Sequence, residues 1–347
     1  MAKALLDVLE GRKPARRPAW LMRQAGRYLP EYLAVRKKAG SFLELCYNPE
    51  LAAEVTLQPL RRYDFDASIV FADILVVPHA LGCDLSFVEN EGPLLSVVRG
   101  MDSVLGLKDG NGPWQFDRVY ETLARVKAEL GGSVALIGFC GAPWTVASYM
   151  IEGRGSDRQI AISAARESAP WFELLLAKIV DVSVSYLLGQ IKAGAEVVQI
   201  FDSWAGDLPR DLLLCCVHEP ITAVVFGVRK IHPGFPVIVF GRGIGAGHVA
   251  LAQATGASAV SVEQDQSLQD VLYSLPEGVA VQGNLNPDVL LAGGSALAQA
   301  VRAICATVPK ERHIFNLGHG ILQQTPLENV AEMLKVVRAH DGDAFNV

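Results

Sequence analysis

Cysteines paired at the spacing C-x-x-C are missing from this sequence of 347 residues. Disulfide frameworks and zinc ribbons depend on paired spacings such as C-x-x-C, and no such pair occurs. The cysteines lie instead in apolar stretches, at Cys46, Cys83, Cys140, Cys215, Cys216 and Cys305. We therefore expect reduced thiols packed in the core of a cytoplasmic protein.

Motifs for metal or nucleotide chemistry are also missing. The sequence contains no H-E-x-x-H, no H-x-C element and no G-x-x-x-x-G-K-[ST] loop. Neither a catalytic metal nor nucleotide hydrolysis is therefore expected.

An excess of positive charge is lacking as well, since 31 Lys and Arg stand against 37 Asp and Glu, a net charge of −6. Such a surface does not attract nucleic acid or anionic membranes, and neither is expected as a partner. The basic residues gather at the start of the chain, where residues 1–62 hold twelve Lys and Arg and six Asp and Glu. An anionic ligand is expected to bind near this segment.

Apolar segments typical of membrane or secretory proteins are not evident. Residues 1–18 contain Asp7 and Glu10 and no apolar run of the kind found in secretory signals. Residues 134–151 are uncharged, but glycines and a proline interrupt them, which favours strand, turn and helix over a membrane span.

Eight short apolar runs recur, separated by longer segments with helical spacing. They lack the alternation of a half-exposed strand, which is typical of a parallel sheet buried on both faces. The pattern predicts an α/β fold over residues 1–347, a single (βα)8 TIM-type barrel with long insertions after strands 1 and 2, at residues 24–66 and 72–133. An open doubly wound sheet is the alternative. The predicted strands are residues 19–23, 67–71, 134–139, 196–201, 236–240, 257–262, 279–282 and 313–317.

Residues that can do chemistry follow most of these runs, and in a barrel the carboxyl ends of the strands converge on one site. They are Arg23, Asp73, Cys140, Gly141, Asp202, Ser203, Gly241, Arg242, Glu263, Gly283, Asn284 and His319.

Arg23 and Arg27 share one segment, MRQAGRYLPEY, and two guanidinium forks suit a ligand with several carboxylates. A solvated basic loop is the alternative. Asp73 either serves the site or caps the helix that follows. His319 stands between two glycines, which favours a ligand close to the backbone over a simple turn.

The segment Gly241 to Ala246 reads G-x-G-x-x-A, and Glu263 follows 22 residues after Gly241. This spacing is close to a dinucleotide-binding turn. Such turns usually follow the first strand of their unit, so we favour a glycine-rich strand end that lets a substrate approach.

Two long segments carry a resemblance to a known family. PAWLMRQAGRYLPEY (residues 18–32) and GFCGAPWTVASYMIEG (residues 138–153) resemble the two signatures of the uroporphyrinogen decarboxylases. The shorter segments FDSWAG, VQGNLNP and NLGHGI follow in the family's order, so the resemblance covers nearly the whole chain.

The resemblance implies a homodimeric (βα)8 barrel that needs no cofactor. It implies decarboxylation of the four acetate side chains of uroporphyrinogen to methyls, giving coproporphyrinogen in haem synthesis. It assigns catalysis to Asp73, Arg23 and Tyr149. Substrate binding falls on Arg23, Arg27, Asp73, Phe139, Tyr149, Ser203 and His319. One departure stands out, because Val262-Glu263-Gln264 replaces the family's usual Leu-Asp-Trp.

Three other functions remain open. A corrinoid-dependent methyltransferase would require zinc held by His and Cys, a dinucleotide-dependent oxidoreductase would use Gly241 and Glu263, and a tetrapyrrole-binding protein would bind without turnover.

Overall fold

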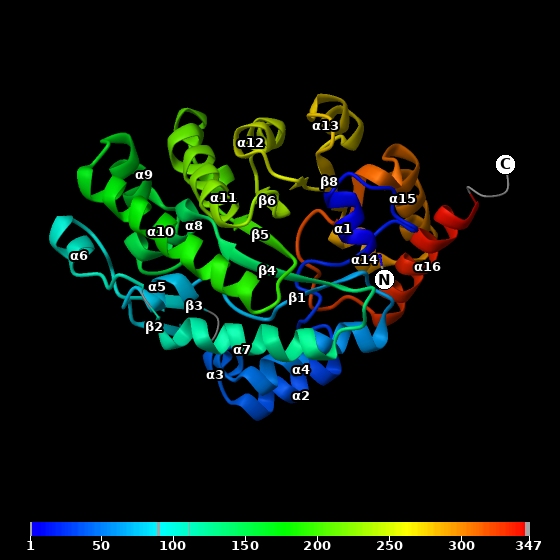
Figure 1. The fold of residues 1–347 in the computed structure, drawn as a ribbon, viewed down its shortest axis with the longest axis horizontal. Helices are drawn as coiled ribbons and strands as arrows, with labels where there is room; N and C mark the ends of the chain where they lie inside the picture. The colour runs from blue at the N-terminus through cyan, green and yellow to red at the C-terminus, as the bar shows by residue number, and fades with distance from the viewer. Residues whose placement is uncertain (1, 89–90, 111, 344–347) are drawn as a thin grey trace.

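The computed structural model describes residues 2–88, 91–110 and 112–343, and its centre is a curled parallel sheet (Figure 1). Seven strands pair in the order β1-β4-β5-β6-β7-β8-β9, and every neighbouring pair is parallel. The strands are β1 (Ala67–Ile69), β4 (Ala135–Gly141), β5 (Val197–Asp202), β6 (Val237–Gly241), β7 (Ala259–Ser261), β8 (Ala280–Leu285) and β9 (His313–Leu317). Seven of the eight predicted runs therefore contain strands, and the parallel α/β sheet is confirmed.

The prediction of a first strand at residues 19–23 is wrong, because these residues form no strand in the structure. Only Ala19 forms a bridge, a parallel one to Phe315, and the Asp66 amide donates to the Ala19 carbonyl on the other side at 2.9 Å. The extended backbone ends because Arg23 adopts a φ of 63° and the Gln24 amide turns back to the Leu21 carbonyl. The position expected for an eighth strand is thus occupied by an irregular segment between β9 and β1.

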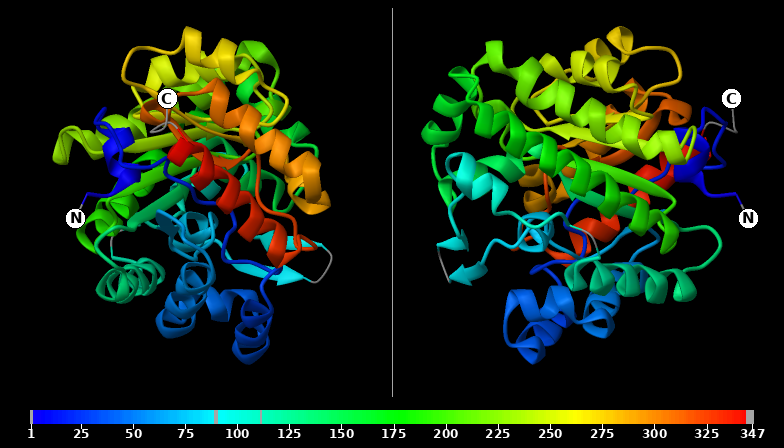
Figure 2. Two further views of the ribbon diagram at one scale, coloured as in Figure 1. Left: turned by 90° about the vertical axis from the view of Figure 1, so that its right-hand side faces the viewer. Right: turned by 60° about the vertical axis from the view of Figure 1, so that its left-hand side comes forward.

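Helices cover the outside of the sheet, as the three ribbon views show (Figures 1 and 2). They are α1 (Ala4–Leu9), α2 (Pro30–Ala39), α3 (Phe42–Tyr47), α4 (Pro49–Arg62), α5 (Val76–Ala80), α6 (Met101–Leu105), α7 (Trp114–Glu129), α8 (Pro143–Glu152), α9 (Gln159–Arg166), α10 (Pro170–Lys192), α11 (Glu219–Ile231), α12 (Gly247–Thr255), α13 (Leu268–Ser274), α14 (Pro287–Ala292), α15 (Gly294–Thr307) and α16 (Leu327–Asp343). α10 and residues 210–231 are long and apolar enough to span a membrane, but about half of each lies buried in the protein, as in core helices.

The segments between β1 and β4 add structure beyond the sheet. Residues 72–133 hold α5, α6, α7 and an antiparallel hairpin of β2 (Leu85–Val88) and β3 (Gly92–Leu95). The hairpin is fastened to the end of α8, because the Leu95 amide donates to the Gly153 carbonyl at 2.7 Å. These segments therefore pack beside the carboxyl ends of the strands.

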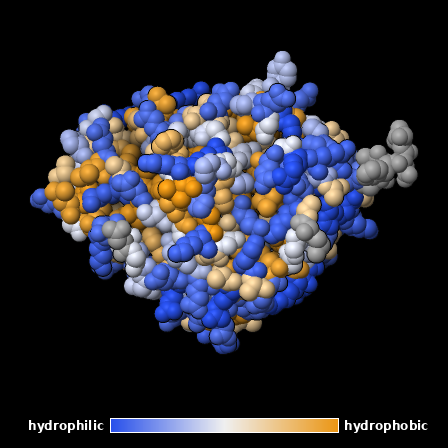
Figure 3. Space-filling model, viewed as in Figure 1, coloured by the Kyte–Doolittle hydropathy of each residue, from blue (hydrophilic) through white to orange (hydrophobic). Residues whose placement is uncertain are grey.

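Exposed apolar side chains gather near α6 and α9, at the left of the face shown in Figure 3. They are Val97, Met101, Leu105 and Ile160, with Leu105 62% exposed. A patch of this kind is typical of a contact surface rather than of scattered surface residues.

Polar side chains bridge the inner face of the sheet. The Trp20 indole donates to Gln282 Oε1 at 2.9 Å, and the Gln282 amide donates to Gln199 Oε1 at 3.1 Å and to Ser261 Oγ at 3.2 Å. All four side chains are fully buried, so each bond replaces one to water. The network fixes the irregular first segment against β8 and β5.

We expect Trp20→Phe to lower the free energy of unfolding by about 1–3 kcal/mol, because the Gln282 carbonyl would lose its donor in the core. Trp114→Phe is the control, since Trp114 is 52% exposed. Urea denaturation of both variants would measure the difference, and equal midpoints would contradict the structural role of this bond.

Candidate active site

Arg23 lies where the irregular first segment turns away from the sheet. Its side chain packs against the loop after β9, so closely that a Cβ on Gly320 would be 2.6 Å from Arg23 Cδ. A side chain at position 320 would therefore displace the Arg23 side chain, which packs beside the backbone next to His319. Two segments nearly 300 residues apart in sequence thus meet at the carboxyl edge of the sheet.

Three arginines stand together at this edge without an acidic partner. Arg23, Arg27 and Arg242 form no ion pair and no side-chain hydrogen bond within residues 2–88, 91–110 and 112–343, although all three are exposed. Partial desolvation by the surrounding side chains, then the charge of Arg242, then that of Arg27, lower the pKa of Arg23. Since Arg27 and Arg242 both repel Arg23, the arrangement favours an anionic ligand over the solvated-loop alternative.

Asp73 follows β1 and faces Arg23. Its Oδ1 accepts a hydrogen bond from the Leu75 amide at 2.8 Å, so the local capping role exists alongside any other. Desolvation outweighs this bond and the charge of Arg23, and raises the pKa of Asp73 from 3.8 to about 6. The carboxylate is thus largely ionised at neutral pH but poorly solvated.

An aromatic wall lies beside Asp73. The Tyr149 ring from α8 lies 6.0 Å from that of Trp204, and burial raises the tyrosine pKa while Asp73 and Arg23 act on the same hydroxyl. Phe139 of β4 and Phe201 of β5 pack edge to face, with ring centroids 5.7 Å apart. Tyr149 therefore lies near Asp73, and the two phenylalanines pack together on neighbouring strands.

His319 lies in the loop after β9. Burial and the charges of Arg23 and Arg242 lower its pKa to about 4, with Glu263 acting in the opposite direction. The imidazole is therefore neutral at pH 7 and can donate one hydrogen bond to a carboxylate.

The structure places Arg27, Asp73, Tyr149 and His319 each within electrostatic reach of Arg23. Phe139 lies on β4 and packs against Phe201 of β5. Ser203 follows β5 as predicted, but its hydroxyl makes no contact with the others among the described residues.

Three residues near the site have no clear signal in the sequence. Phe201 lies inside a strand and therefore looks like core, and Arg242 and Glu263 follow strands without a pattern that shows what they contact. The Trp204 ring also carries Arg158, whose guanidinium lies 4.2 Å from its centroid and pairs with Asp207 at 2.7 Å. A stacking contact between separate loops leaves no sequence signal.

The glycine-rich turn after β6 is occupied by the protein itself. The Gly243 amide donates to Glu263 Oε2 at 2.5 Å, and the backbone of Gly206 lies against Gly243. A dinucleotide turn needs this amide and this acid for phosphate and ribose, so the geometry does not favour the oxidoreductase alternative.

Metal ligands are not grouped in the described ranges. No cluster of three or more His, Cys, Asp or Glu side chains there could hold a metal ion. The zinc site that a methyltransferase would require is therefore not found in the part of the chain that the structure describes.

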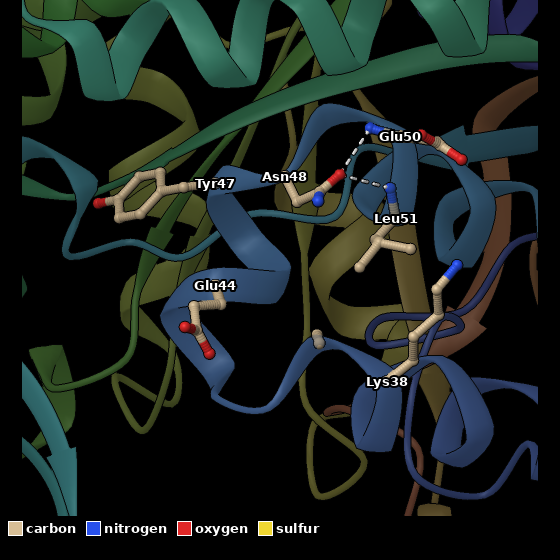
Figure 4. A pocket seen from close by; sticks show the side chains of 7 residues that line it. Lys38, Glu44, Tyr47, Asn48, Glu50 and Leu51 are labelled. Atoms are coloured by element: carbon tan, nitrogen blue, oxygen red, sulfur yellow. Dashed lines mark hydrogen bonds between the residues drawn. The ribbon is translucent and has the colours of Figure 1, made fainter.

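A surface hollow of about 490 Å³ lies elsewhere, beside α2, α3 and the start of α4 (Figure 4). Asn48 at its wall caps α4, as the Asn-Pro-Glu sequence predicts, accepting from the Glu50 and Leu51 amides. The hollow is lined by Lys38, Ala39, Glu44, Tyr47, Asn48, Glu50 and Leu51. None of the predicted site residues lines it, so it is not the candidate site.

Comparison with known proteins gives a consistent result. Residues 1–340 match the family model described as uroporphyrinogen decarboxylase. Curated relatives named uroporphyrinogen decarboxylase include those of Paracoccus denitrificans, 47% identical over 97% of this chain and 99% of the relative, and of Ruegeria pomeroyi, 48% identical over 97% and 98%. Among solved structures, a methyltransferase from Methanosarcina mazei is similar in fold, with a TM-score of 0.79 and 20% identity over 99% of this chain and 98% of that one.

The raised pKa of Asp73 predicts a cost in stability. The folded protein binds the Asp73 proton more tightly than the unfolded chain between about pH 3.8 and 6, so stability falls as the pH rises through 6. We expect Asp73→Asn to increase the free energy of unfolding at pH 7.5 by about 1–2 kcal/mol, and by less near pH 5.

Urea denaturation at the two pH values measures the gain, with Asp265→Asn, at an exposed aspartate, as the control. A destabilised Asp73→Asn protein at pH 7.5 would show that the carboxylate is not strained by desolvation.

Proposed function

The chain belongs to the uroporphyrinogen decarboxylase family, and from that premise we propose that it removes the four acetate carboxyls of uroporphyrinogen to give coproporphyrinogen in haem synthesis. Each step converts –CH2–CO2⁻ and one proton to –CH3 and CO2. The observation that carries the proposal is the poorly solvated Asp73 carboxylate among three unpaired arginines. The site therefore offers one anion for a developing cation and several cations for the substrate's eight carboxylates.

We assign the electron sink to the substrate and its stabilisation to Asp73. Loss of CO2 leaves a carbanion, and protonation of the pyrrole ring supplies a cationic iminium that accepts its electrons. A carboxylate fixed in a water-poor site stabilises this cation without reorganising, as oxyanion holes do for anions. Its pKa of about 6 keeps it ionised at neutral pH.

Arg23 is the proposed proton donor, directly or through a water beside it. Partial desolvation and the charges of Arg242 and Arg27 lower its pKa, which makes it a better acid than an arginine in free solution. Tyr149, Arg27, Ser203 and His319 are assigned to orienting the substrate's carboxylates and ring. Phe139 belongs to the apolar wall, which disfavours the charged leaving carboxylate by desolvation.

We further propose that the curled sheet closes as a (βα)8 barrel, with residues 18–22 in place of the eighth strand. Support comes from the backbone bonds of this segment to Phe315 and Asp66 on its two sides. The chain is proposed to be one domain, residues 1–347, acting in the cytoplasm as a homodimer. The apolar patch near α6 and α9 supports such an association.

The direct test is an anaerobic assay of the metal-stripped protein with reduced uroporphyrinogen, followed by separation of the oxidised products by carboxylate count. We expect a ladder from eight to four carboxylates, and we expect Asp73→Asn to remain folded while losing most of its kcat/KM.

If the octacarboxylate remained unchanged, the proposed decarboxylase activity would be refuted. If the folded protein bound the octacarboxylate without turnover, a tetrapyrrole-binding protein would be indicated. Stoichiometric zinc in the purified protein would instead favour a methyltransferase.

Arg23→Lys retains the charge but loses the planar fork and the donor geometry. We expect kcat/KM to fall at least about 100-fold, because the remaining ammonium reaches neither the proton-transfer position nor two carboxylate oxygens together. Arg302→Lys on α15 is the matched control and should leave kcat/KM unchanged. Near-normal activity of Arg23→Lys would place Arg23 in a solvated loop.

A further inference from the structure

Trp204 lies directly after Ser203, in the loop that follows β5, and its backbone is fixed to the start of α8. Its amide donates to Thr145 Oγ1 at 3.1 Å, and its carbonyl accepts from the Trp144 indole at 3.1 Å. The Thr145 hydroxyl in turn donates to Asp202 Oδ1 at 2.6 Å, and both of these side chains are fully buried. The position of Trp204 relative to α8 is therefore set by a hydrogen-bond network in the core.

The indole ring of Trp204 lies against Tyr149, one turn further along α8. Thr145 and Tyr149 are four residues apart on this helix, so their side chains lie on the same face. Thr145 holds the Trp204 backbone, and the Tyr149 ring lies 6.0 Å from the indole, with the two planes 58° apart. One face of α8 thus fixes both the backbone of Trp204 and the neighbour of its ring.

Arg158 packs on the Trp204 ring from the loop between α8 and α9. Its guanidinium carbon lies 4.2 Å from the ring centroid, the guanidinium pairs with Asp207 at 2.7 Å, and only 12% of the side chain is exposed. The Arg158 amide donates to Ser156 Oγ at 2.9 Å, and its carbonyl accepts from the Ile162 amide at 2.9 Å. A cation held over an aromatic face and largely shielded from water restrains the ring.

The Tyr149 hydroxyl has a hydrogen to donate. Burial raises the pKa of this hydroxyl, and a hydrogen bond with the Trp204 side chain opposes the rise. An indole can only donate, so its N–H takes a lone pair of the tyrosine oxygen. In residues 2–88, 91–110 and 112–343 the hydroxyl donates to no acceptor. Its hydrogen is therefore available to a ligand.

Two features favour a role in the site over a purely structural stack. Trp204 and Tyr149 are each only partly buried, so the pair borders accessible space instead of filling the core. Trp204 also follows Ser203, which the family resemblance assigns to substrate binding. The loop that carries Trp204 therefore faces the same ligand as Tyr149.

We propose that Trp204, restrained by Arg158, is a positioning residue for Tyr149, which it holds with the hydroxyl hydrogen directed at a carboxylate of the substrate. This inference rests on the proposed function and deepens it, because it assigns Tyr149 the role of donor and names the residues that enforce that role. Without the indole the tyrosine ring regains rotational freedom, and part of the orientation of the substrate is lost. Trp204 acts on the reaction through Tyr149.

The test is a double-mutant cycle of Trp204→Phe and Tyr149→Phe in the anaerobic assay with uroporphyrinogen. Trp204→Phe retains a ring beside Arg158 but loses the N–H. We expect it to lower kcat/KM about tenfold, divided between kcat and KM as in Tyr149→Phe. In the Tyr149→Phe background it should change kcat/KM less than about twofold, because the hydroxyl that it positions is gone.

Arg158 is tested in the same way. Arg158→Gln removes the charge over the ring, and we expect kcat/KM to fall about threefold when Tyr149 is present and to stay unchanged in Tyr149→Phe. Arg158→Lys should recover part of this loss, since an ammonium also binds an aromatic face but cannot stack on it. Arg166→Gln, at an exposed arginine of α9, is the matched control and should equal the wild type.

Additive losses would overturn the inference. If Trp204→Phe lowered kcat/KM by the same factor with and without the Tyr149 hydroxyl, or did not lower it at all, Trp204 would not act through Tyr149. If Trp204→Phe failed to fold, the same comparison with Arg158→Gln would decide.

Equilibrium binding of oxidised uroporphyrin, followed by fluorescence, repeats the cycle without catalysis. If the wild type released no CO2 but Trp204→Phe weakened binding only when the Tyr149 hydroxyl was present, the positioning role would stand and the decarboxylase function would fail. If the wild type released CO2 and the losses were additive, the decarboxylase function would stand and the positioning role would fail.

Discussion

The site depends on the repulsion among Arg23, Arg27 and Arg242, which no acidic side chain of the described residues neutralises by an ion pair. Like charges held together raise the energy of the empty site, and an anionic ligand relieves it. Asp73 does not cancel this excess, because it is a single carboxylate that is itself disfavoured by desolvation. Burial first, and then the charges of Arg23 and Arg242, lower the pKa of His319, and the excess of positive charge fits a substrate with eight carboxylates.

Such an arrangement persists only if the rest of the fold holds it. The irregular segment with Arg23 is fastened by backbone bonds to Phe315 and Asp66 and by the buried Trp20–Gln282 bond. The loop with Arg242 is fastened to Asp202, Gly206 and Glu263. The strands form a rigid base. The repulsion between the arginines is therefore confined to the carboxyl ends of the strands, where an anionic ligand can relieve it.

Much of the fold was predictable because buried parallel strands are continuous apolar runs, and seven such runs are strands in the structure. The first run failed because the positive φ of Arg23, which ends the extended backbone, leaves no trace in hydrophobicity. The site was predictable to the extent that its residues follow strands or lie in recognisable signatures, as Asp73 and Tyr149 do. Phe201 was not, because a strand residue that faces the site looks like core. The lack of an acidic partner for Arg242 among the described residues was not predictable either, since Glu263 bonds instead to the Gly243 amide, 20 residues away in sequence.

The most direct test of this account is the ionisation of the Asp73 carboxyl in the free protein, followed by carbon NMR of aspartate-labelled protein and assigned by comparison with Asp73→Asn. The account predicts titration near pH 6, because desolvation opposes the charge more than Arg23 and the Leu75 amide favour it. Titration at or below the ordinary value of 3.8 would contradict it. The positive charge of the arginines would then stabilise the carboxylate in the free protein, and less of its charge would be available to stabilise a substrate cation.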